Sequence, residues 1–215
     1  MGRKTTEILY GFHSVYEALK AGRRRFETLY ISRSRSGKRG GNIFSLAAAA
    51  GIRVSVTDAV HLETLAQSDA HQGIAAITSG FPAGTGSDVL PWIRNQQRPF
   101  FALVLDQIED PQNLGALVRT ALCTGVDGIM IPKDRSALPT PAVSRASAGA
   151  MEHAQLFVVT NTAATLRTLK ENQAWTAGLD AGGDTPLFQA DLTGHLALVV
   201  GGEHKGIRPG VRREC

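Results

Sequence analysis

Residues 105–132 read LDQIEDPQNLGALVRTALCTGVDGIMIP, and their pattern decides the class of fold. The run that leads into them, Phe100–Leu105, is almost continuously apolar, as expected of a strand covered on both faces. Apolar residues then recur at helical spacing over Leu114–Thr124, Gly125 ends the helix, and a second strand begins at 128–131. This order of strand, helix and strand predicts an α/β layer built on a parallel sheet.

Two polar side chains flank this predicted helix. Asn113 is a good N-cap for it, and Arg119 interrupts its apolar positions. Six residues of regular helix would put the two on different faces, but a capping residue lies outside the helix and can point over the strand's carboxyl end. Open α/β sheets bind ligands at that edge, so both side chains are candidates for one site. In the alternative interpretation, Asn113 only caps the helix and Arg119 only pairs with a nearby acid: Asp106, Glu109 or Asp110.

A third candidate follows another predicted strand, LALVV at 196–200, which leads into Gly201, Gly202 and Glu203. Two glycines allow a ligand to approach the backbone closely, and Glu203 would lie at the same sheet edge as Asn113. The alternatives are a tight turn for the glycines and a surface salt bridge for the glutamate. The chain has no G-x-G-x-x-G after a strand and no G-x-x-x-x-G-K-[ST], so a dinucleotide site or a P-loop has no support.

Length and composition favour two domains. The chain has 215 residues, 43% of them hydrophobic and 20% charged, which is enough for two cores. Strands and helices alternate on both sides of 80–87, a stretch rich in turn-forming residues. We expect a first domain over 1–80, a linker and lead-in over 81–98, and a second domain over 99–215. In the first domain we expect helices at 14–20, 43–50 and 59–66 and strands at 28–32, 53–56 and 74–78; in the second, helices at 114–124, 141–150 and 163–171 and strands at 100–105, 128–131, 156–159, 175–179 and 196–200.

The location and metal content of the protein follow from simple absences in the sequence. No run of eighteen apolar residues and no signal-peptide core is present, so we expect a cytoplasmic protein without a membrane partner. The two cysteines, Cys123 and Cys215, have no metal-ligand spacing. We therefore expect neither a metal site nor a disulfide framework.

The positive charge of the chain is concentrated at its N-terminal end. Residues 1–80 hold eleven Lys and Arg against six Asp and Glu, whereas residues 81–215 hold twelve against thirteen. Basic side chains that neutralise backbone phosphates give sequence-independent affinity for nucleic acid. A solvated surface without a partner is the alternative. The candidate phosphate-contacting residues are Arg23, Arg24, Arg25, Arg33, Arg35, Lys38 and Arg39.

Several segments together resemble a known family. PQNLGALVRTA, SRASAGAMEH, VTNTAATLRTLKEN and LTGHLALVVGGEHKGIRPGVRREC occur in this order, behind a basic domain that opens YGFHSVYEAL and ends AHQGIAAI. They resemble the SpoU/TrmH family of RNA ribose 2′-O-methyltransferases, in particular the branch that acts on guanosine in large-subunit ribosomal RNA. The resemblance covers nearly the whole chain. It implies a small N-terminal α/β RNA-binding domain and a parallel-sheet α/β-knot (SPOUT) methyltransferase domain that works as a homodimer on ribosomal RNA, with the active site near the subunit interface.

The resemblance also assigns roles to residues. Asn113 and Arg119 match the polar residues of the family's first motif, and Glu203 matches the acid of its second motif. Gly201 and Gly202 match the turn that contacts S-adenosylmethionine, the implied cofactor. Leu179 matches a position near the cofactor's adenine.

These residue types suit methyl transfer to a ribose 2′-hydroxyl. Such a hydroxyl is a poor nucleophile whose proton must be polarised or removed and whose position must be held. A guanidinium keeps its proton in proteins, so we expect Arg119 to clamp the target phosphate and stabilise the developing alkoxide. In this hypothesis the proton leaves through phosphate or water, and Asn113 and Glu203 orient Arg119 and the ribose.

The sequence departs from the family in two places. The family's third motif, an Ile-Pro segment and a Ser-Leu-Asn-Val run, would come after Cys215. We therefore expect the knot to be incomplete, S-adenosylmethionine to bind weakly and an apolar surface to be exposed. The second departure is His204, where many relatives have glycine.

Two other functions stay open on the sequence. The missing motif favours a non-catalytic RNA-binding or ribosome-associated protein with an inert second domain, whereas the retained polar triad argues against it. An unrelated α/β enzyme for a small anionic substrate would fit the crevice but leave the basic segment without a role.

Overall fold

The computed structural model describes residues 6–35 and 41–215, which divide into two compact units. The first unit comprises residues 1–82 and 139–153, and the second comprises 83–138 and 154–215. This division differs from the expected one, because 139–153 lies between two strands of the second unit in the sequence but packs with the first. Residues 83–94, expected to belong to the linker and lead-in, form ordered structure in the second unit.

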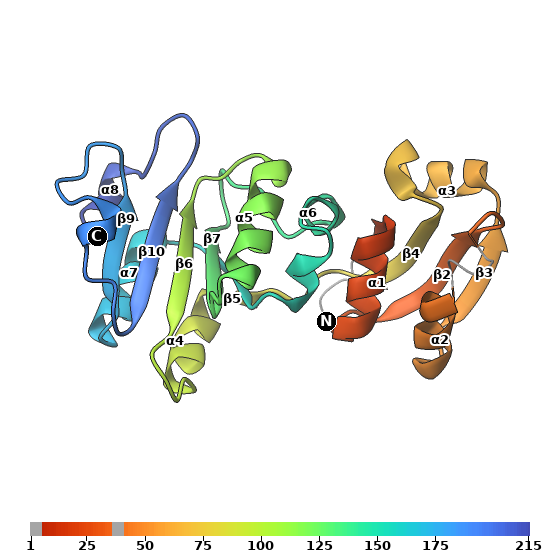
Figure 1. Ribbon diagram of the computed structural model, residues 1–215, viewed down its shortest axis with the longest axis horizontal. Helices are drawn as coiled ribbons and strands as arrows, with labels where there is room; N and C mark the ends of the chain where they lie inside the picture. The colour runs from red at the N-terminus through yellow and green to blue at the C-terminus, as the bar shows by residue number, and fades with distance from the viewer. Residues whose placement is uncertain (1–5, 36–40) are drawn as a thin grey trace. The chain divides into compact units, whose positions relative to one another are not determined.

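The first unit is built on a four-stranded sheet in the order β1-β4-β2-β3 (Figure 1). β4 is antiparallel to β1 and β2, and β2 is parallel to β3. The expected elements are present, but the sequence pattern missed β1. The strands are β1 (Thr6–Tyr10), β2 (Phe26–Ser32), β3 (Arg53–Thr57) and β4 (Ile74–Ser79), and the helices are α1 (Phe12–Ala21), α2 (Gly41–Ala49) and α3 (Ala59–Ala66), followed by the 3-10 turn η2 (Asp69–His71).

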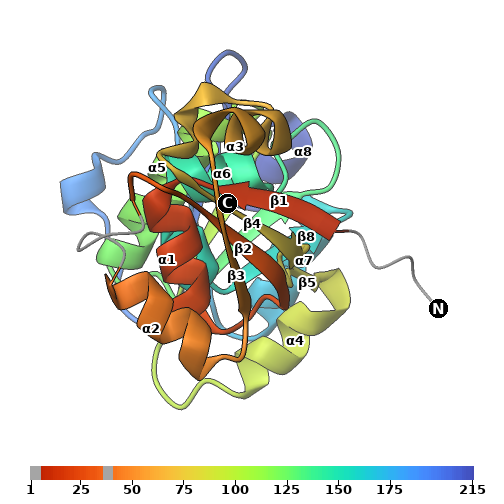
Figure 2. The same ribbon diagram turned by 90° about the vertical axis from the view of Figure 1, so that its right-hand side faces the viewer.

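The helices of this unit cover both faces of its sheet (Figure 2). Leu29 of β2 packs in one buried cluster with Val15 of α1 and Ile43 of α2. Successive residues of a strand point to opposite faces, so Tyr30 points away from Leu29. The Tyr30 ring lies against the ring of His61 on α3, with ring centres 5.6 Å apart. Both faces of β2 are therefore covered, by α1 and α2 on one side and by α3 on the other.

The segment 139–153 joins the first unit through a buried ion pair. It contains α6 (Pro141–Ala146) and the 3-10 turn η3 (Ala150–His153) where the sequence predicts one helix over 141–150. Glu152 accepts hydrogen bonds from Arg24 Nε at 2.7 Å and Nη2 at 3.1 Å, and both side chains are fully buried. Ser144 Oγ donates to the same carboxylate at 2.7 Å. Hydrogen bonds of this kind are needed because a buried charge without a partner would strongly destabilise the fold.

The second unit is a six-stranded sheet in the order β5-β8-β7-β6-β10-β9, with every neighbouring pair parallel. The expected parallel α/β architecture is confirmed. The short strand β5, the helix α4 and the last helix α8 are additional. The strands are β5 (Gly84–Thr85), β6 (Phe101–Asp106), β7 (Gly128–Pro132), β8 (Leu156–Val159), β9 (Trp175–Leu179) and β10 (Leu196–Gly201); the helices are α4 (Gly86–Arg94), α5 (Pro111–Cys123), α7 (Thr162–Glu171) and α8 (Pro209–Arg212), with the 3-10 turn η4 (Leu187–Gln189).

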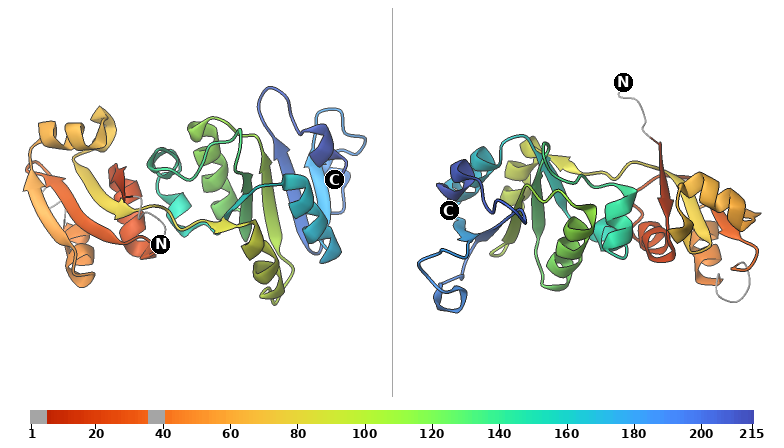
Figure 3. Two further views of the ribbon diagram at one scale, coloured as in Figure 1. Left: turned by 180° about the vertical axis from the view of Figure 1, so that it is seen from behind. Right: turned by 90° about the horizontal axis from the view of Figure 1, so that it is seen from above.

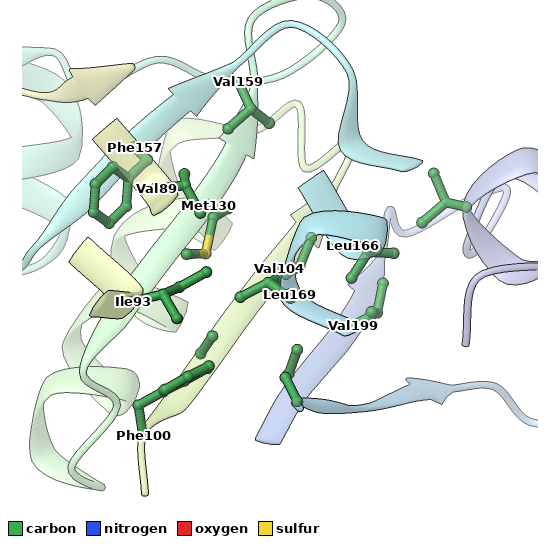
Figure 4. Close-up of a cluster of buried hydrophobic side chains, with 14 of the residues drawn as sticks. Val89, Ile93, Phe100, Val104, Met130, Phe157, Val159, Leu166, Leu169 and Val199 are labelled. Carbon is green, nitrogen blue, oxygen red and sulfur yellow. The ribbon is translucent and has the colours of Figure 1, made fainter. Parts of the chain in front are cut away.

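The two faces of this sheet are buried, which explains the continuous apolar strands read from the sequence. One face carries a cluster to which α4 contributes Ile93, α7 contributes Leu166, and β6 contributes Val104 (Figure 4). α5 lies on the opposite face, where Leu114 and Val118 are buried (Figure 3). Helices therefore cover both faces of the sheet.

The strand order changes direction between β6 and β10. From β6 the chain adds β7 and β8 on one side, and then β9 and β10 on the other. Crevices for ligands form at such switch points, outside the carboxyl ends of the strands. β9 is an edge strand, and its Trp175 and Leu179 are 61% and 40% exposed.

Candidate active site at the ends of β6 and β10

Strand register brings two loops of the second unit together. β6 ends at Asp106 and β10 ends at Gly201, and these two residues pair directly. The chain leaving each strand therefore starts from the same edge of the sheet. Asp106 is fully buried and accepts hydrogen bonds from the backbone N–H of Arg208 at 2.9 Å and from its guanidinium. This ion pair fastens the loop after β10 to the end of β6.

Two glycines let the loops approach closely. A Cβ on Gly202 would lie 2.4 Å from the carbonyl oxygen of Gln107, and one on Gly201 would lie 2.1 Å from the carbonyl carbon of Gly206. Real Cβ atoms do not approach backbone this closely, so larger residues would force the loops apart. Gln107 itself has a φ of 63°, in the left-handed region that non-glycine residues rarely adopt. Strained backbone of this kind is concentrated at functional sites.

Asn113 and Glu203 meet across the two loops. The Asn113 amide nitrogen donates a hydrogen bond to a Glu203 carboxylate oxygen at 2.5 Å. The pKa of Glu203 is lowered by backbone hydrogen bonding and by the Asn113 amide, with a smaller contribution from His204. Glu203 therefore stays ionised at neutral pH, whereas a general base works best with a pKa close to neutrality. The arrangement suits a carboxylate that orients and stabilises rather than one that removes a proton.

The Asn113–Glu203 pair separates two adjoining cavities of about 420 Å³ each. The first is polar and contains the acids Glu109 and Asp110 as well as Lys205. The second continues over apolar side chains, including Ile108, Leu117 and Val200. Cavities of this size with apolar walls and a few converging polar groups are typical of small-molecule sites. For brevity, the two together are called the β6–β10 site.

Asn113 is not the N-cap of its helix, contrary to the sequence prediction. Asp110 is the N-cap, and its carboxylate accepts a hydrogen bond from Gln112 N at 2.9 Å. Pro111 can begin the helix because the first helical position needs no backbone donor. The helix thus starts three residues earlier than expected, and Asn113 lies in its first turn.

Arg119 does not line either cavity of the β6–β10 site. With Asn113 inside the helix, six residues at about 100° each leave the two side chains roughly 120° apart around α5. Arg119 is exposed on that other face. Of the alternative pairings, those with Asp106 and Asp110 are not favoured either, because Asp106 binds Arg208 and Asp110 caps α5. The predicted convergence of three groups is therefore reduced to two, Asn113 and Glu203.

Leu179 ends β9 beside Val200 of β10, at the same edge of the sheet as the two glycines. It is 40% exposed and does not line the β6–β10 cavities. Sequence reasoning missed two contributors to the site, Gln107 and Arg208. The signal for Arg208 was available, because Asp106 ends a buried strand and a buried carboxylate needs a partner.

The structure also revises the predicted phosphate-contacting set. Arg24 is buried between Glu152 and Glu7, so it has no surface to offer a phosphate, and the expectation for it is wrong. Arg23 is half-buried and donates to the carbonyl oxygen of Glu152 at 3.4 Å. The other described members are at least partly accessible: Arg25, Arg33 and Arg35, whereas Lys38 and Arg39 lie outside the described residues.

Within residues 6–35 and 41–215, no group of three or more His, Cys, Asp or Glu side chains is placed to hold a metal ion. Both cysteines are free. None of the helices in these ranges is long and apolar enough to cross a bilayer.

Comparison with known proteins identifies both parts of the chain. Residues 101–215 match the SpoU rRNA Methylase family, and residues 8–83 match the RNA 2′-O ribose methyltransferase substrate-binding family. The chain belongs to the SpoU rRNA methylase family. The family resemblance predicted from the sequence is thereby confirmed.

Relatives of this SpoU methylase match it over nearly its full length. The 23S rRNA (guanosine-2′-O-)-methyltransferase RlmB of Shewanella oneidensis is 38% identical over 212 residues, which are 99% of this chain and 85% of the relative. The protein of the same name from Escherichia coli K12 is 34% identical over 210 residues, 98% of this chain and 86% of the relative.

Solved structures share the fold of this SpoU methylase. An AdoMet-bound rRNA methyltransferase from Sinorhizobium meliloti superposes with a TM-score of 0.77 at 21% identity, over 98% of this chain and 76% of that one. The SpoU methyltransferase AviRb from Streptomyces viridochromogenes, in complex with AdoMet, gives 0.78 at 18% identity, over 98% of this chain and 78% of that one.

Proposed function

We propose that this protein transfers a methyl group from S-adenosylmethionine to a ribose 2′-hydroxyl of ribosomal RNA, at a guanosine of the large-subunit RNA. The observation that carries the proposal is the meeting of Asn113 and Glu203 at the switch point of a SpoU methylase sheet. The names of the relatives supply the substrate and the nucleotide. Because those relatives are named for acting on 23S rRNA, the proposed reaction takes place in the cytoplasm.

The residues of the β6–β10 site fit the proposed cofactor. S-adenosylmethionine, when bound, supplies an electrophilic methyl group on a cationic sulfur. Glu109, Asp110 and Glu203 give the polar cavity carboxylates that suit such a cation. The turn at Gly201 and Gly202 presents backbone without side chains, and the adjoining apolar walls suit the uncharged parts of the molecule.

The chain's own polar groups then orient the ribose. Asn113 holds the Glu203 carboxylate in place, and the ionised carboxylate can accept a hydrogen bond from a ribose hydroxyl. Positioning of a weak nucleophile removes a large part of the barrier. Arg119, exposed on the other face of α5, clamps a phosphate of the bound RNA outside the cavity. The proton leaves through that phosphate or through water.

We further propose that the protein works as a homodimer and that residues 1–80 bind the RNA. The match of residues 8–83 to a substrate-binding family and the accessible arginines support the second statement. The family resemblance supports the first. Light scattering of the purified chain tests it, because a monomeric mass at micromolar concentration would contradict the dimer.

A methyl-transfer assay tests the proposed function directly. Tritium from labelled S-adenosylmethionine is followed into transcribed 23S rRNA, with the cofactor at saturating concentration. Asn113→Ala and Glu203→Gln should each lower kcat by at least tenfold, whereas Asp191→Asn, an exposed carboxylate beside Thr193, serves as the control. Incorporation into the base rather than the 2′-oxygen, or none by the unmodified chain while RNA is bound, would refute the proposal.

A further inference from the structure

The N-terminal unit contains a cavity of its own, of about 590 Å³. It lies where α1 begins, beside the end of β2 and the turn that precedes β4. We call it the α1 cavity, and its lining includes Phe12, His13, Ser34, Arg35 and Gln72. None of these residues takes part in the β6–β10 site.

The α1 cavity has a flat aromatic and guanidinium surface. The guanidinium of Arg35 lies 4.8 Å from the centre of the Phe12 ring. The Phe12 ring also stacks nearly parallel to the Tyr16 ring, with ring centres 5.8 Å apart, and the His13 ring meets it edge-on at 5.5 Å. Unpaired RNA bases are recognised by stacking on aromatic rings and on arginine guanidinium planes. Phe12 is half-buried, so its ring is available in part.

Hydrogen-bonding groups surround this flat surface. Gln72 uses its side-chain oxygen to accept from Phe12 N–H at 3.0 Å, so its remaining hydrogen bonds are chiefly N–H donations. The hydroxyls of Ser32 and Ser34 are 3.1 Å apart and can each donate or accept. Donors and acceptors of this kind match the edge of a base or a ribose hydroxyl.

Positive potential is also concentrated at the α1 cavity. α1 starts at Phe12 with glycine as its N-cap and no acid in its first turn, and the neutral Gln72 amide accepts from its first N–H. The first turn therefore carries no negative charge of its own against the partial positive charge of the helix start, and Arg35 adds a full positive charge at the same cavity. Gly73 keeps the wall open, because a Cβ there would lie 2.6 Å from the Ser32 hydroxyl. Stacking surface, polar edge groups and positive charge together match the three parts of a nucleotide.

We propose that the α1 cavity binds one unpaired nucleotide of the RNA substrate, with its base against the Arg35–Phe12 pair. The inference rests on the proposed function, because that function names the RNA. It assigns to Phe12, Gln72 and Ser34 a role that the charge pattern of the sequence did not suggest. It also gives Arg35 a stacking role in place of a purely electrostatic one.

Matched variants test the proposal in the full chain. Phe12→Leu removes the ring, and Phe44→Leu removes another half-buried ring packed on the same cluster but outside the cavity. Arg35→Gln removes the guanidinium, and Arg53→Gln removes an exposed charge from β3. Filter binding to transcribed 23S rRNA should show about tenfold weaker affinity for Phe12→Leu, since stacking of one base is worth roughly that factor or more. Arg35→Gln should weaken binding about fivefold beyond Arg53→Gln.

Ultraviolet cross-linking locates the contact independently. Irradiation of the unmodified chain with the same transcript, followed by trypsin and mass spectrometry, should place a nucleotide on the peptide 5–20, which contains Phe12. Steady-state methylation by Arg35→Gln should show a raised KM for RNA with kcat retained, because Arg35 is not part of the β6–β10 site. If Phe12→Leu does not fold, Arg35→Gln and the cross-link carry the test.

The results separate this inference from the proposed function. Variants that bind as their controls do, or a peptide 5–20 free of cross-links at saturating RNA, overturn the α1 cavity proposal even when methyl transfer proceeds. Cross-linking at that peptide without any methyl transfer would instead refute the proposed function and leave the nucleotide site standing.

Discussion

Replacing Glu152 by glutamine removes one buried charge from the N-terminal unit and keeps the shape of the side chain. In the structure the Glu152 carboxylate accepts two hydrogen bonds from Arg24 and one from Ser144, and it is fully buried. Breaking a buried pair costs about 3–5 kcal/mol. Arg24 keeps its contacts with Glu7 at 2.7 Å and with the Ser79 carbonyl at 3.0 Å, so we expect the lower end, about 3 kcal/mol.

Urea unfolding measures this loss, and the chain offers separate reporters. All three tyrosines, at positions 10, 16 and 30, lie in the first unit, and both tryptophans, at 92 and 175, lie in the second. With an m-value of roughly 2 kcal/mol per molar urea, the tyrosine transition of Glu152→Gln should fall by roughly 1.5 M. The tryptophan transition should shift less.

The control is Glu17→Gln on α1, which also faces the segment 139–153. Glu17 contacts His153 at 2.8 Å but is 24% exposed, and partly exposed pairs contribute at most about 1 kcal/mol. Replacing both partners, as Arg24→Met with Glu152→Met, should recover a large part of the loss because no unpaired charge stays buried. A tyrosine transition that moves no further for Glu152→Gln than for Glu17→Gln would refute the reasoning.

Three further predictions concern the site and the RNA surface. Asn113→Ala removes one of the hydrogen bonds that hold the pKa of Glu203 down, so the acidic limb of the kcat/KM profile should move to higher pH; an unshifted limb would exclude Glu203 as the group that titrates. Gly202→Ala forces a Cβ against the Gln107 carbonyl and should destabilise the second unit by about 1–3 kcal/mol, seen as a lower tryptophan midpoint, whereas Gly86→Ala in the same unit meets no such clash. Arg25→Gln, whose guanidinium is about half exposed, should reduce the slope of log affinity against log salt by roughly one; the same slope as the unmodified chain would remove Arg25 from the RNA surface.

The fold could be predicted from the sequence because hydrophobic periodicity and strand–helix alternation are local. The strand 100–105 and the helix after it are visible in the pattern, and parallel pairing follows from their alternation. The start of α5 was misplaced, because Asp110 and Asn113 are both good N-caps and Pro111 decides between them only if its place at the first helical position is recognised. That shift of three residues moved Arg119 away from the Asn113–Glu203 pair.

Long-range partners were the part that local pattern could not supply. The run Arg23–Arg24–Arg25 reads as one basic patch, yet the structure buries the middle residue against Glu152, more than a hundred positions later. Whether a side chain is buried depends on which distant segment packs over it. The residues around Arg24 in the sequence do not indicate that segment. In contrast, Asn113 and Glu203 could be paired in advance, because parallel strands share their carboxyl edge.

Because residues 139–153 belong to the N-terminal unit, that unit is discontinuous in the amino-acid sequence. The chain passes between the two units three times, at 82/83, 138/139 and 153/154. The units are therefore joined by three backbone connections rather than by a single linker. A proteolytic or recombinant fragment ending near residue 82 would keep the pair of Arg24 with Glu7 but lose Glu152, the fully buried carboxylate that accepts two hydrogen bonds from Arg24. A fragment meant to represent the N-terminal unit therefore has to include residues 139–153. Without them, its measured properties would be those of an incomplete unit.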